Sequence, residues 1–135
     1  MTKEALCRQA VLAMKNAYVP YSGFSVGAAL LCADGSVYTG CNIENAAFTP
    51  TVCAERTAVF KAVSEGKRAF SAIAVASGKN GLPDAAFPPC GVCRQVLAEF
   101  CAPDMQVYVC EKDGSIRAFT LSELLPFAFT PRFMK

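Results

Sequence analysis

The pattern of hydrophobic and polar positions first predicts a helix near the start of the chain. Residues 3–18 contain neither Pro nor Gly, and apolar side chains recur among them at helical spacing. These positions are Leu6, Ala10, Ala13 and Ala17. Because Pro20 and Gly23 disfavour a continuing helix, we expect the amphipathic helix to end before them.

Two strand-like segments follow this helix. Residues 25–33 are a nearly continuous apolar run, and residues 37–43 return as a second strand-forming run. The dipeptide Asp34-Gly35 between them is a typical hairpin turn. The two segments therefore predict a β-hairpin.

The remainder of the chain alternates between helices and strands. We expect helices at residues 53–65, 90–101 and 121–125, and strands at residues 70–76, 106–110 and 115–119. Gly66 and Pro103 follow the first two of these helices, where a cap and a stop are expected. Strands that alternate with helices of about a dozen residues imply βαβ crossovers. The order α-β-β-α-β-α-β-β-α predicts an α/β fold, in which a five-stranded mixed sheet is covered by helices on its faces.

Length and charge indicate one ordinary domain over residues 1–135 that acts on a small molecule. The net charge is only +2, and Lys and Arg are scattered, so the footprint expected for nucleic acid or an anionic membrane is missing. Glu4 and Arg8 interrupt the amino-terminal segment, and no apolar stretch approaches the roughly 20 residues that cross a bilayer. We therefore expect a cytoplasmic protein with neither a nucleic-acid nor a membrane partner.

The chain contains no histidine, which excludes several reaction classes. A Ser-His-Asp triad, a Cys-His pair, a His-ligated zinc ion and an imidazole proton shuttle all require this side chain. Proton transfer near neutral pH must therefore fall to a carboxylate of shifted pKa, a thiol, a lysine or metal-bound water.

Three of the eight cysteines fall in two motifs that are typical of a metal site. The motifs are Cys53-Ala54-Glu55 and Pro89-Cys90-Gly91-Val92-Cys93. Three thiolates leave the fourth position of a tetrahedral zinc ion open for water, as in catalytic rather than structural sites. Zinc lowers the pKa of that water from about 15.7 towards about 7, and we expect Glu55 to move the proton.

Helical spacing separates the expected ligands from the expected proton carrier. Cys90 and Cys93 are three apart, so both sulfurs can reach one ion from the first turn of a helix, and Cys53 must arrive from the other helix. Residues two apart do not share a helical face, so Glu55 should diverge from Cys53. Taken alone, Cys90-x-x-Cys93 is also typical of a redox pair or of half a zinc knuckle. We interpret the other five cysteines as buried core residues: Cys7, Cys32, Cys41, Cys101 and Cys110.

Charge counting calls for a basic residue near the cysteines. Three thiolates and one zinc ion sum to −1, which weakens the pull of the metal on the proton of its water. Arg56 follows Glu55 and Arg94 follows Cys93, so either guanidinium could donate to the sulfurs. We hypothesise that Arg56 has this role, the alternative being a simple surface arginine.

Five segments spread over nearly the whole chain carry a resemblance to a known family. They are Pro20-Tyr21-Ser22-Gly23-Phe24, Val26-Gly27-Ala28-Ala29, Cys41-Asn42-Ile43-Glu44-Asn45-Ala46, Cys53-Ala54-Glu55-Arg56 and Pro89-Cys90-Gly91-Val92-Cys93-Arg94-Gln95. With these segments the chain closely resembles the small, homotetrameric, zinc-dependent cytidine deaminases. Cys53 stands where the wider pattern of zinc deaminases has histidine. The resemblance implies a three-layer α-β-α fold, one Zn²⁺ per subunit, and a homotetramer in which neighbouring subunits complete the active sites.

The resemblance also implies the reaction. Cytidine and 2′-deoxycytidine would be deaminated hydrolytically to uridine and 2′-deoxyuridine with release of ammonia, as in pyrimidine salvage. Glu55 would take the proton of the attacking water, deliver it to ring N3 and later assist departure of the amine. The backbone N–H of Ala54 would contact the base carbonyl, and the backbone near Pro89 would read the exocyclic amine.

Four further positions match nucleoside-binding residues of the family. Asn42 and Glu44 would bind the 3′-hydroxyl of the sugar, since residues two apart at a strand end point to one side. Without the family, a turn role is the simpler interpretation of this pair. Phe24 would pack against the nucleoside, and Phe129 would reach the pocket of a neighbouring subunit and stack there. The competing candidates for this last role are Phe127 and Phe133.

Two alternative functions stay open. The substrate could be another cytosine nucleoside, such as an antibiotic of the blasticidin type, or the chain could be a zinc-stabilised binding module without catalysis. Asn42 and Glu44 favour a free nucleoside. The sequence shows neither a basic channel nor a run of exposed aromatic residues for tracking a polynucleotide.

Overall fold

Five strands form one mixed sheet in the order β2-β1-β3-β4-β5. The computed structural model describes residues 1–79 and 81–134, and the strands are β1 (Phe24–Cys32), β2 (Val37–Cys41), β3 (Phe70–Lys79), β4 (Gln106–Cys110) and β5 (Ile116–Thr120). β1 is antiparallel to both β2 and β3, β3 is parallel to β4, and β4 is antiparallel to β5. The predicted five-stranded mixed sheet is therefore confirmed.

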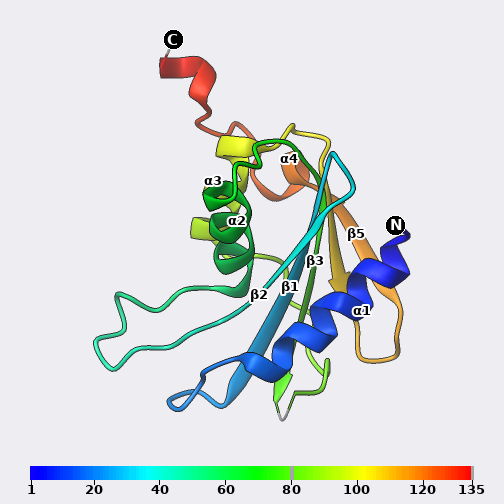
Figure 1. The fold of residues 1–135 in the computed structure, drawn as a ribbon, viewed down its shortest axis with the longest axis vertical. Helices are drawn as coiled ribbons and strands as arrows, with labels where there is room; N and C mark the ends of the chain where they lie inside the picture. The colour runs from blue at the N-terminus through cyan, green and yellow to red at the C-terminus, as the bar shows by residue number, and fades with distance from the viewer. Residues whose placement is uncertain (80, 135) are drawn as a thin grey trace.

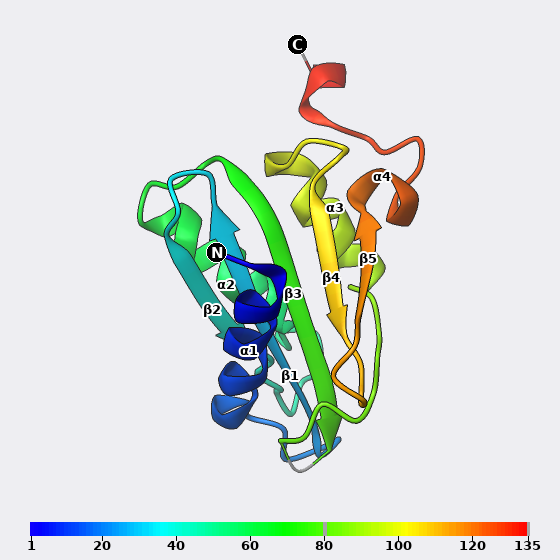
Figure 2. The ribbon, with the colours of Figure 1, turned by 90° about the vertical axis from the view of Figure 1, so that its right-hand side faces the viewer.

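Helices cover both faces of this sheet (Figures 1 and 2). They are α1 (Lys3–Ala13), α2 (Ala54–Ser64), α3 (Gly91–Phe100) and α4 (Leu121–Leu124), with 3-10 turns η1 (Met14–Asn16) and η2 (Pro131–Met134). α1 packs on one face, and α2 and α3 pack on the other. Because β2 and β3 are both antiparallel to β1, α2 and α3 each connect two parallel strands, as predicted. Within residues 1–79 and 81–134, every helix is too short or too polar to span a bilayer.

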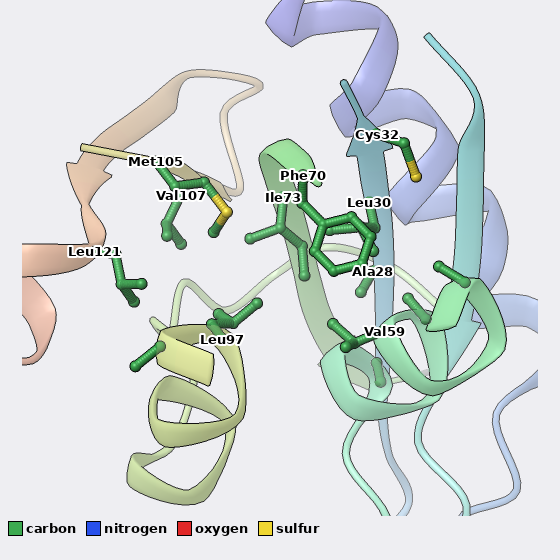
Figure 3. Close-up of a cluster of buried hydrophobic side chains, with 14 residues drawn as sticks. Ala28, Leu30, Cys32, Val59, Phe70, Ile73, Leu97, Met105, Val107 and Leu121 are labelled. Carbon is green, nitrogen blue, oxygen red and sulfur yellow. The ribbon is translucent and has the colours of Figure 1, made fainter. Parts of the chain in front are cut away.

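The two sides of the strands supply two hydrophobic cores. Ala28 and Leu30 of β1 face the layer of α2 and α3, whereas Ala29 between them faces α1. Figure 3 shows the larger core, where side chains of the sheet meet those of the two helices: Ile73, Val107, Val59 and Leu97. Full burial of each Leu, Ile or Val contributes about 1.5–3 kcal/mol. This core therefore fixes the two helices that carry the cysteine motifs.

The first turns of α2 lie directly against β2 at a glycine. A Cβ atom added to Gly40 would stand 2.5 Å from the nitrogen of Ala58 and 2.6 Å from the carbonyl oxygen of Ala54. The hydroxyl of Thr57 also donates to the carbonyl oxygen of Cys41, over 3.0 Å. This close approach fixes the position of the amino-terminal end of α2, where Cys53 and Glu55 lie.

The first helix is shorter than the predicted residues 3–18. α1 ends at Ala13 and continues only as the 3-10 turn η1. The N–H of Tyr18 instead donates to the carbonyl oxygen of Asn42 over 3.0 Å, and its own carbonyl accepts from the N–H of Glu44 over 2.8 Å. A tertiary pairing that lies 24 to 26 residues away along the chain therefore ends the helix. Asn42 and Glu44 pair with Tyr18, and β2 ends at Cys41 instead of at the predicted residue 43.

Three of the five cysteines outside the two motifs are buried, as predicted. Cys7 and Cys110 lie in the core beneath α1, and Cys32 lies in the larger core. Cys41 and Cys101 are only half-buried, because Cys41 ends an edge strand and Cys101 follows the last turn of α3. Burial nevertheless raises the pKa of the Cys101 thiol to about 12. None of these cysteines is joined in a disulfide.

Candidate active site

The amino-terminal ends of α2 and α3 bring three sulfur atoms together. Cys53 and Cys90 are the N-cap residues of the two helices, and Cys93 lies in the first turn of α3. The sulfurs of Cys53 and Cys90 are 3.7 Å apart, and those of Cys90 and Cys93 are 3.5 Å apart. All three lie within 4.8 Å of one another. The two segments, which are 37 residues apart in sequence, thus form one site.

The sulfur distances fit a tetrahedral zinc ion. Zn–S bonds of about 2.3 Å place two ligand sulfurs about 3.8 Å apart. The observed separations are close to this value, so a zinc ion can bind with little rearrangement. Both helix termini also point their positive dipole ends at the thiolates, which stabilises negative charge there. Among the described residues, this is the only group of three or more candidate ligands that meets.

The pKa values of the Cys53 and Cys93 thiols are shifted in opposite directions. The pKa of Cys53 is lowered to about 5, chiefly by a hydrogen bond with Cys93 and also by Arg56. The same hydrogen bond, together with burial, raises the pKa of Cys93. The thiolate form is thus favoured at Cys53, to which Arg56 also donates a hydrogen bond.

Glu55 is a buried carboxyl group beside the sulfurs. It lies in the first turn of α2 with only 4% of its surface exposed. Burial raises the pKa of Glu55 to about 7, and the neighbouring Cys53 thiolate raises it as well. Its carboxylate lies outside the set of mutually close ligand atoms. The geometry thus suits a proton carrier that operates near neutral pH.

The two arginines of the motifs point to different partners. Nη2 of Arg56 donates to Sγ of Cys53 over 3.3 Å, while its Nε is buried and finds no hydrogen-bond partner among the described residues. Arg94 donates from Nε to the carbonyl oxygen of Pro89 and from Nη1 to that of Leu124, over 2.6 and 2.7 Å. Arg56 is thus placed to offset thiolate charge, whereas Arg94 ties the loop before α3 to α4.

Asn42 binds the start of β1, and Glu44 binds the turn that leads into it. The amide of Asn42 accepts from the N–H of Val26 over 2.8 Å and donates to the carbonyl oxygen of Phe24 over 2.9 Å. The carboxylate of Glu44 accepts from the N–H groups of Tyr21 and Ser22, over 3.0 and 3.1 Å. Both residues therefore bond to backbone groups of this part of the chain, Asn42 in β1 and Glu44 in the turn before it. Their contact with a sugar stays a prediction.

The remaining predicted site residues lie in different surroundings. Ala54 is fully buried at the first position of α2, where helix geometry leaves its N–H without an intrahelical partner. Phe24 is half-buried, and its ring lies 5.6 Å from that of the exposed Phe87. Phe129 lies instead in the carboxy-terminal segment, which projects from the layers in Figures 1 and 2. Its ring is exposed and stacks on Phe133 at 5.7 Å.

Comparison with known proteins identifies the family of this chain. Residues 1–109 match the family described as the cytidine and deoxycytidylate deaminase zinc-binding region. The chain belongs to the cytidine deaminase family.

Curated cytidine deaminases match almost the whole chain. The protein from Halalkalibacterium halodurans is 53% identical over 134 residues, which are 99% of this chain and 98% of that protein. The cytidine deaminase from Sporosarcina psychrophila is 52% identical over 130 residues, or 96% of this chain and 93% of that protein. The crystal structure of cytidine deaminase from Burkholderia pseudomallei has a TM-score of 0.87 at 44% identity, covering 96% of this chain and all of that one.

Family membership settles the cofactor. The zinc-binding region of the cytidine deaminase family spans both cysteine motifs, and the sulfur distances fit zinc. Zinc is therefore the cofactor of this chain, with one ion per subunit at the cysteine cluster. The redox-pair interpretation of Cys90 and Cys93 no longer applies.

Sequence reasoning overlooked Ser22 and Phe87. The hydroxyl of Ser22 donates to Oε2 of Glu44 and accepts from the N–H of Phe24 over 3.0 Å. A serine that accepts from the N–H two residues later is a recognised turn signal, so Ser22-Gly23-Phe24 could have been found. The contact between Phe24 and Phe87 joins residues 63 apart along the chain and has no local signal.

Proposed function

We propose that this chain deaminates cytidine and 2′-deoxycytidine hydrolytically to uridine and 2′-deoxyuridine, with release of ammonia. The observation that carries the proposal is the buried carboxyl group of Glu55 beside three sulfurs at zinc-ligand spacing. The named activity of relatives that are 53% and 52% identical supports the same substrate. The reaction is one of pyrimidine salvage.

Glu55 carries the protons in this proposal. Bound zinc supplies the Lewis acidity that makes water a nucleophile near neutral pH. Glu55 takes one proton of that water and delivers it to ring N3. It then takes the second proton, from the hydroxyl group now on C4, and gives it to the departing amine. A pKa of about 7 lets one carboxyl group accept and donate protons at neutral pH.

Groups around the site offset the thiolate charge and orient the cytosine base. The guanidinium of Arg56 on the Cys53 sulfur offsets part of the thiolate charge. The N–H of Ala54, at the start of α2, is free to donate to the cytosine carbonyl. The loop before α3, which Arg94 holds at the carbonyl oxygen of Pro89, faces the exocyclic amine. Asn42 and Glu44 bind the 3′-hydroxyl, and Phe24 packs against the nucleoside.

We further propose a homotetramer in which neighbouring subunits complete each site. Three phenylalanines of the carboxy-terminal segment expose most of their surface: Phe127, Phe129 and Phe133. Stacking of one such ring on a base contributes about 1–3 kcal/mol. Phe129 is our candidate, because the side chain of Gln95 on α3 holds its carbonyl oxygen over 2.8 Å. A cytoplasmic location fits eight free thiols, three of which must stay reduced to bind zinc.

The alternative substrate is a nucleoside antibiotic. A blasticidin-S deaminase from Bacillus cereus is 35% identical over 109 residues, well below the 53% and 52% of the cytidine deaminases from Halalkalibacterium halodurans and Sporosarcina psychrophila. Ammonia release from cytidine, 2′-deoxycytidine, blasticidin S and single-stranded DNA separates the possibilities. We expect release from the first two only.

A single substitution tests whether the zinc site is catalytic. Glu55→Ala should keep its zinc and lose several orders of magnitude in turnover, since proton transfer by a positioned group contributes about 10²–10⁴-fold. Glu99→Ala, which removes an exposed carboxylate on α3, is the matched control and should behave as the wild type. A Glu55→Ala protein with unchanged turnover would favour a zinc-stabilised binding module.

A further inference from the structure

The segment before β1 holds the carboxylate of Glu44 in three hydrogen bonds. Oε1 of Glu44 accepts from two backbone N–H groups, those of Tyr21 and Ser22. Oε2 accepts from the hydroxyl of Ser22. A carboxylate has about four acceptor positions. Three are therefore taken, and the one that remains lies on Oε2.

Ser22 links this carboxylate to the backbone of Phe24. Its hydroxyl has only one proton, which goes to Glu44, so its own oxygen is left to accept from the N–H of Phe24 at 3.0 Å. The carbonyl oxygen of Phe24 is bound in turn by the amide of Asn42 at 2.9 Å. The three residues assigned to the nucleoside are thus joined through one exposed hydroxyl.

Solvent and ligands can reach the free acceptor position. Ser22 and Glu44 line a surface pocket of about 370 Å³, together with Tyr21, Phe48 and Thr51. The rings of Tyr21 and Phe48 meet edge to face at 6.2 Å on its wall. The hydrogen bond from Ser22 is the largest influence that lowers the pKa of Glu44, so the carboxylate is a charged acceptor at neutral pH.

We infer that Ser22 is a positioning residue of the sugar subsite, and that it leaves Glu44 one acceptor position for a single sugar hydroxyl. This inference rests on the proposed function. It implies that the site reads one hydroxyl of the substrate through Glu44 and does not hold a cis-diol there. Loss of the Ser22 hydroxyl then releases the carboxylate from its fixed orientation and weakens this one contact.

Three substrates and one substitution test the inference. We compare cytidine, 2′-deoxycytidine and 3′-deoxycytidine with wild-type protein and Ser22→Ala. The first two carry the 3′-hydroxyl assigned to Glu44, and the third does not. For these two, Ser22→Ala should raise KM by about tenfold at nearly unchanged kcat, the effect of weakening one hydrogen bond to a charged group. For 3′-deoxycytidine, the substitution should leave kcat/KM nearly unchanged.

Two control variants separate positioning from folding. Ser22→Thr keeps a hydroxyl and should restore the wild-type KM. Ser36→Ala removes a matched hydroxyl that donates to Asp34 in the β1–β2 hairpin. It should leave KM and kcat unchanged for all three substrates. An equal loss of kcat/KM by Ser22→Ala on all three substrates would overturn the role of Ser22 and indicate a merely structural residue. Wild-type protein that releases no ammonia from cytidine would instead overturn the proposed function itself.

Discussion

Arg56 donates a hydrogen bond from Nη2 to Sγ of Cys53 over 3.3 Å, and the two residues are one helical turn apart at the start of α2. A cation is therefore built into the same turn that supplies a zinc ligand. Three thiolates and a divalent ion carry a net charge of −1, and the guanidinium brings this group to neutrality. A thiolate that accepts a hydrogen bond donates less electron density to the zinc ion. The zinc ion therefore stays a stronger Lewis acid.

Arg56→Gln should therefore weaken both turnover and zinc binding. Loss of a group that bonds to a metal ligand typically costs about 10–100-fold in activity or metal affinity. Steady-state kinetics and zinc content after dialysis against a chelator measure the two effects. Arg68→Gln is the control, because this guanidinium bonds only the main-chain oxygens of Val63 and Lys67 among the described residues. Unchanged zinc content and turnover in Arg56→Gln would refute the role.

Gly27→Ala should destabilise the fold. A Cβ atom at Gly27 would stand 2.0 Å from the carbonyl oxygen of Ala10 and 2.7 Å from the nitrogen of Met14. Helix α1 must then move off the sheet, at a cost of about 1–3 kcal/mol in the free energy of unfolding. Urea unfolding measures the change. Gly91→Ala is the matched control, since its Cβ meets no other atom within 4 Å, and equal stability of the two variants would contradict the close packing of α1.

Asp34→Asn should remove a pH-dependent contribution to stability. The hydrogen bond from Lys67, at 2.7 Å, is the largest influence that lowers the pKa of Asp34, followed by those from Ser36. A carboxyl group with a lowered pKa in the folded state stabilises the fold above its unfolded-state pKa and loses this contribution as the pH falls. The wild type should thus be more stable than Asp34→Asn at neutral pH. The difference in the free energy of unfolding should shrink as the pH falls towards the lowered pKa of Asp34.

The effect at Asp34 will be small, because this carboxylate is exposed and Lys67 is only half-buried. Asparagine keeps an oxygen that can accept from Ser36, so the comparison isolates the charge. Chemical unfolding at neutral pH and at about pH 2 provides the measurement. Asp104→Asn, at an exposed aspartate elsewhere, is the control. A difference that persists undiminished in acid would show that the charge is not its cause.

Assemblies of two impaired variants should regain activity if neighbouring subunits share a site. Glu55→Ala lacks the proton carrier, and Phe129→Ala lacks the proposed stacking ring. Co-expression with two affinity tags yields mixed assemblies, in which some sites combine a natural Glu55 with a natural Phe129. Their activity should exceed that of either variant alone.

The same experiment identifies the ring. Phe127→Ala and Phe133→Ala replace Phe129→Ala in matched mixtures. The ring that completes the site is the one whose loss lowers activity in a uniform assembly and is compensated in the mixture with Glu55→Ala. Light scattering reports the size of each assembly. A fully active monomer would contradict the homotetramer and the role of Phe129 together.

Most element positions could be predicted from local pattern, and the errors lie at tertiary contacts. Gly66 follows α2 with a φ of 93°, as a helix cap requires, because this signal is local. The end of α1 was misplaced because Tyr18 pairs with Asn42 and Glu44, which no helical periodicity reveals. Strand β3 extends to Lys79, beyond the predicted residue 76, because its last residues pair with the start of β1.

The sequence by itself determined the chemistry of this protein and the order of its elements. Cysteine spacing, helix starts and the absence of histidine are local properties, and they are enough to assign a zinc site with Glu55 beside it. Only the tertiary structure decided that Arg56 rather than Arg94 bonds a sulfur, and that Ser22 joins Glu44 to Phe24. Arg56 lies within one helical turn of Cys53, but the choice between the two arginines depends on the carbonyl oxygen of Leu124, which binds Arg94 from 30 residues away. The contact between Ser22 and Glu44 joins residues 22 apart, and the spacing of residues along a chain does not encode how such segments pack against each other.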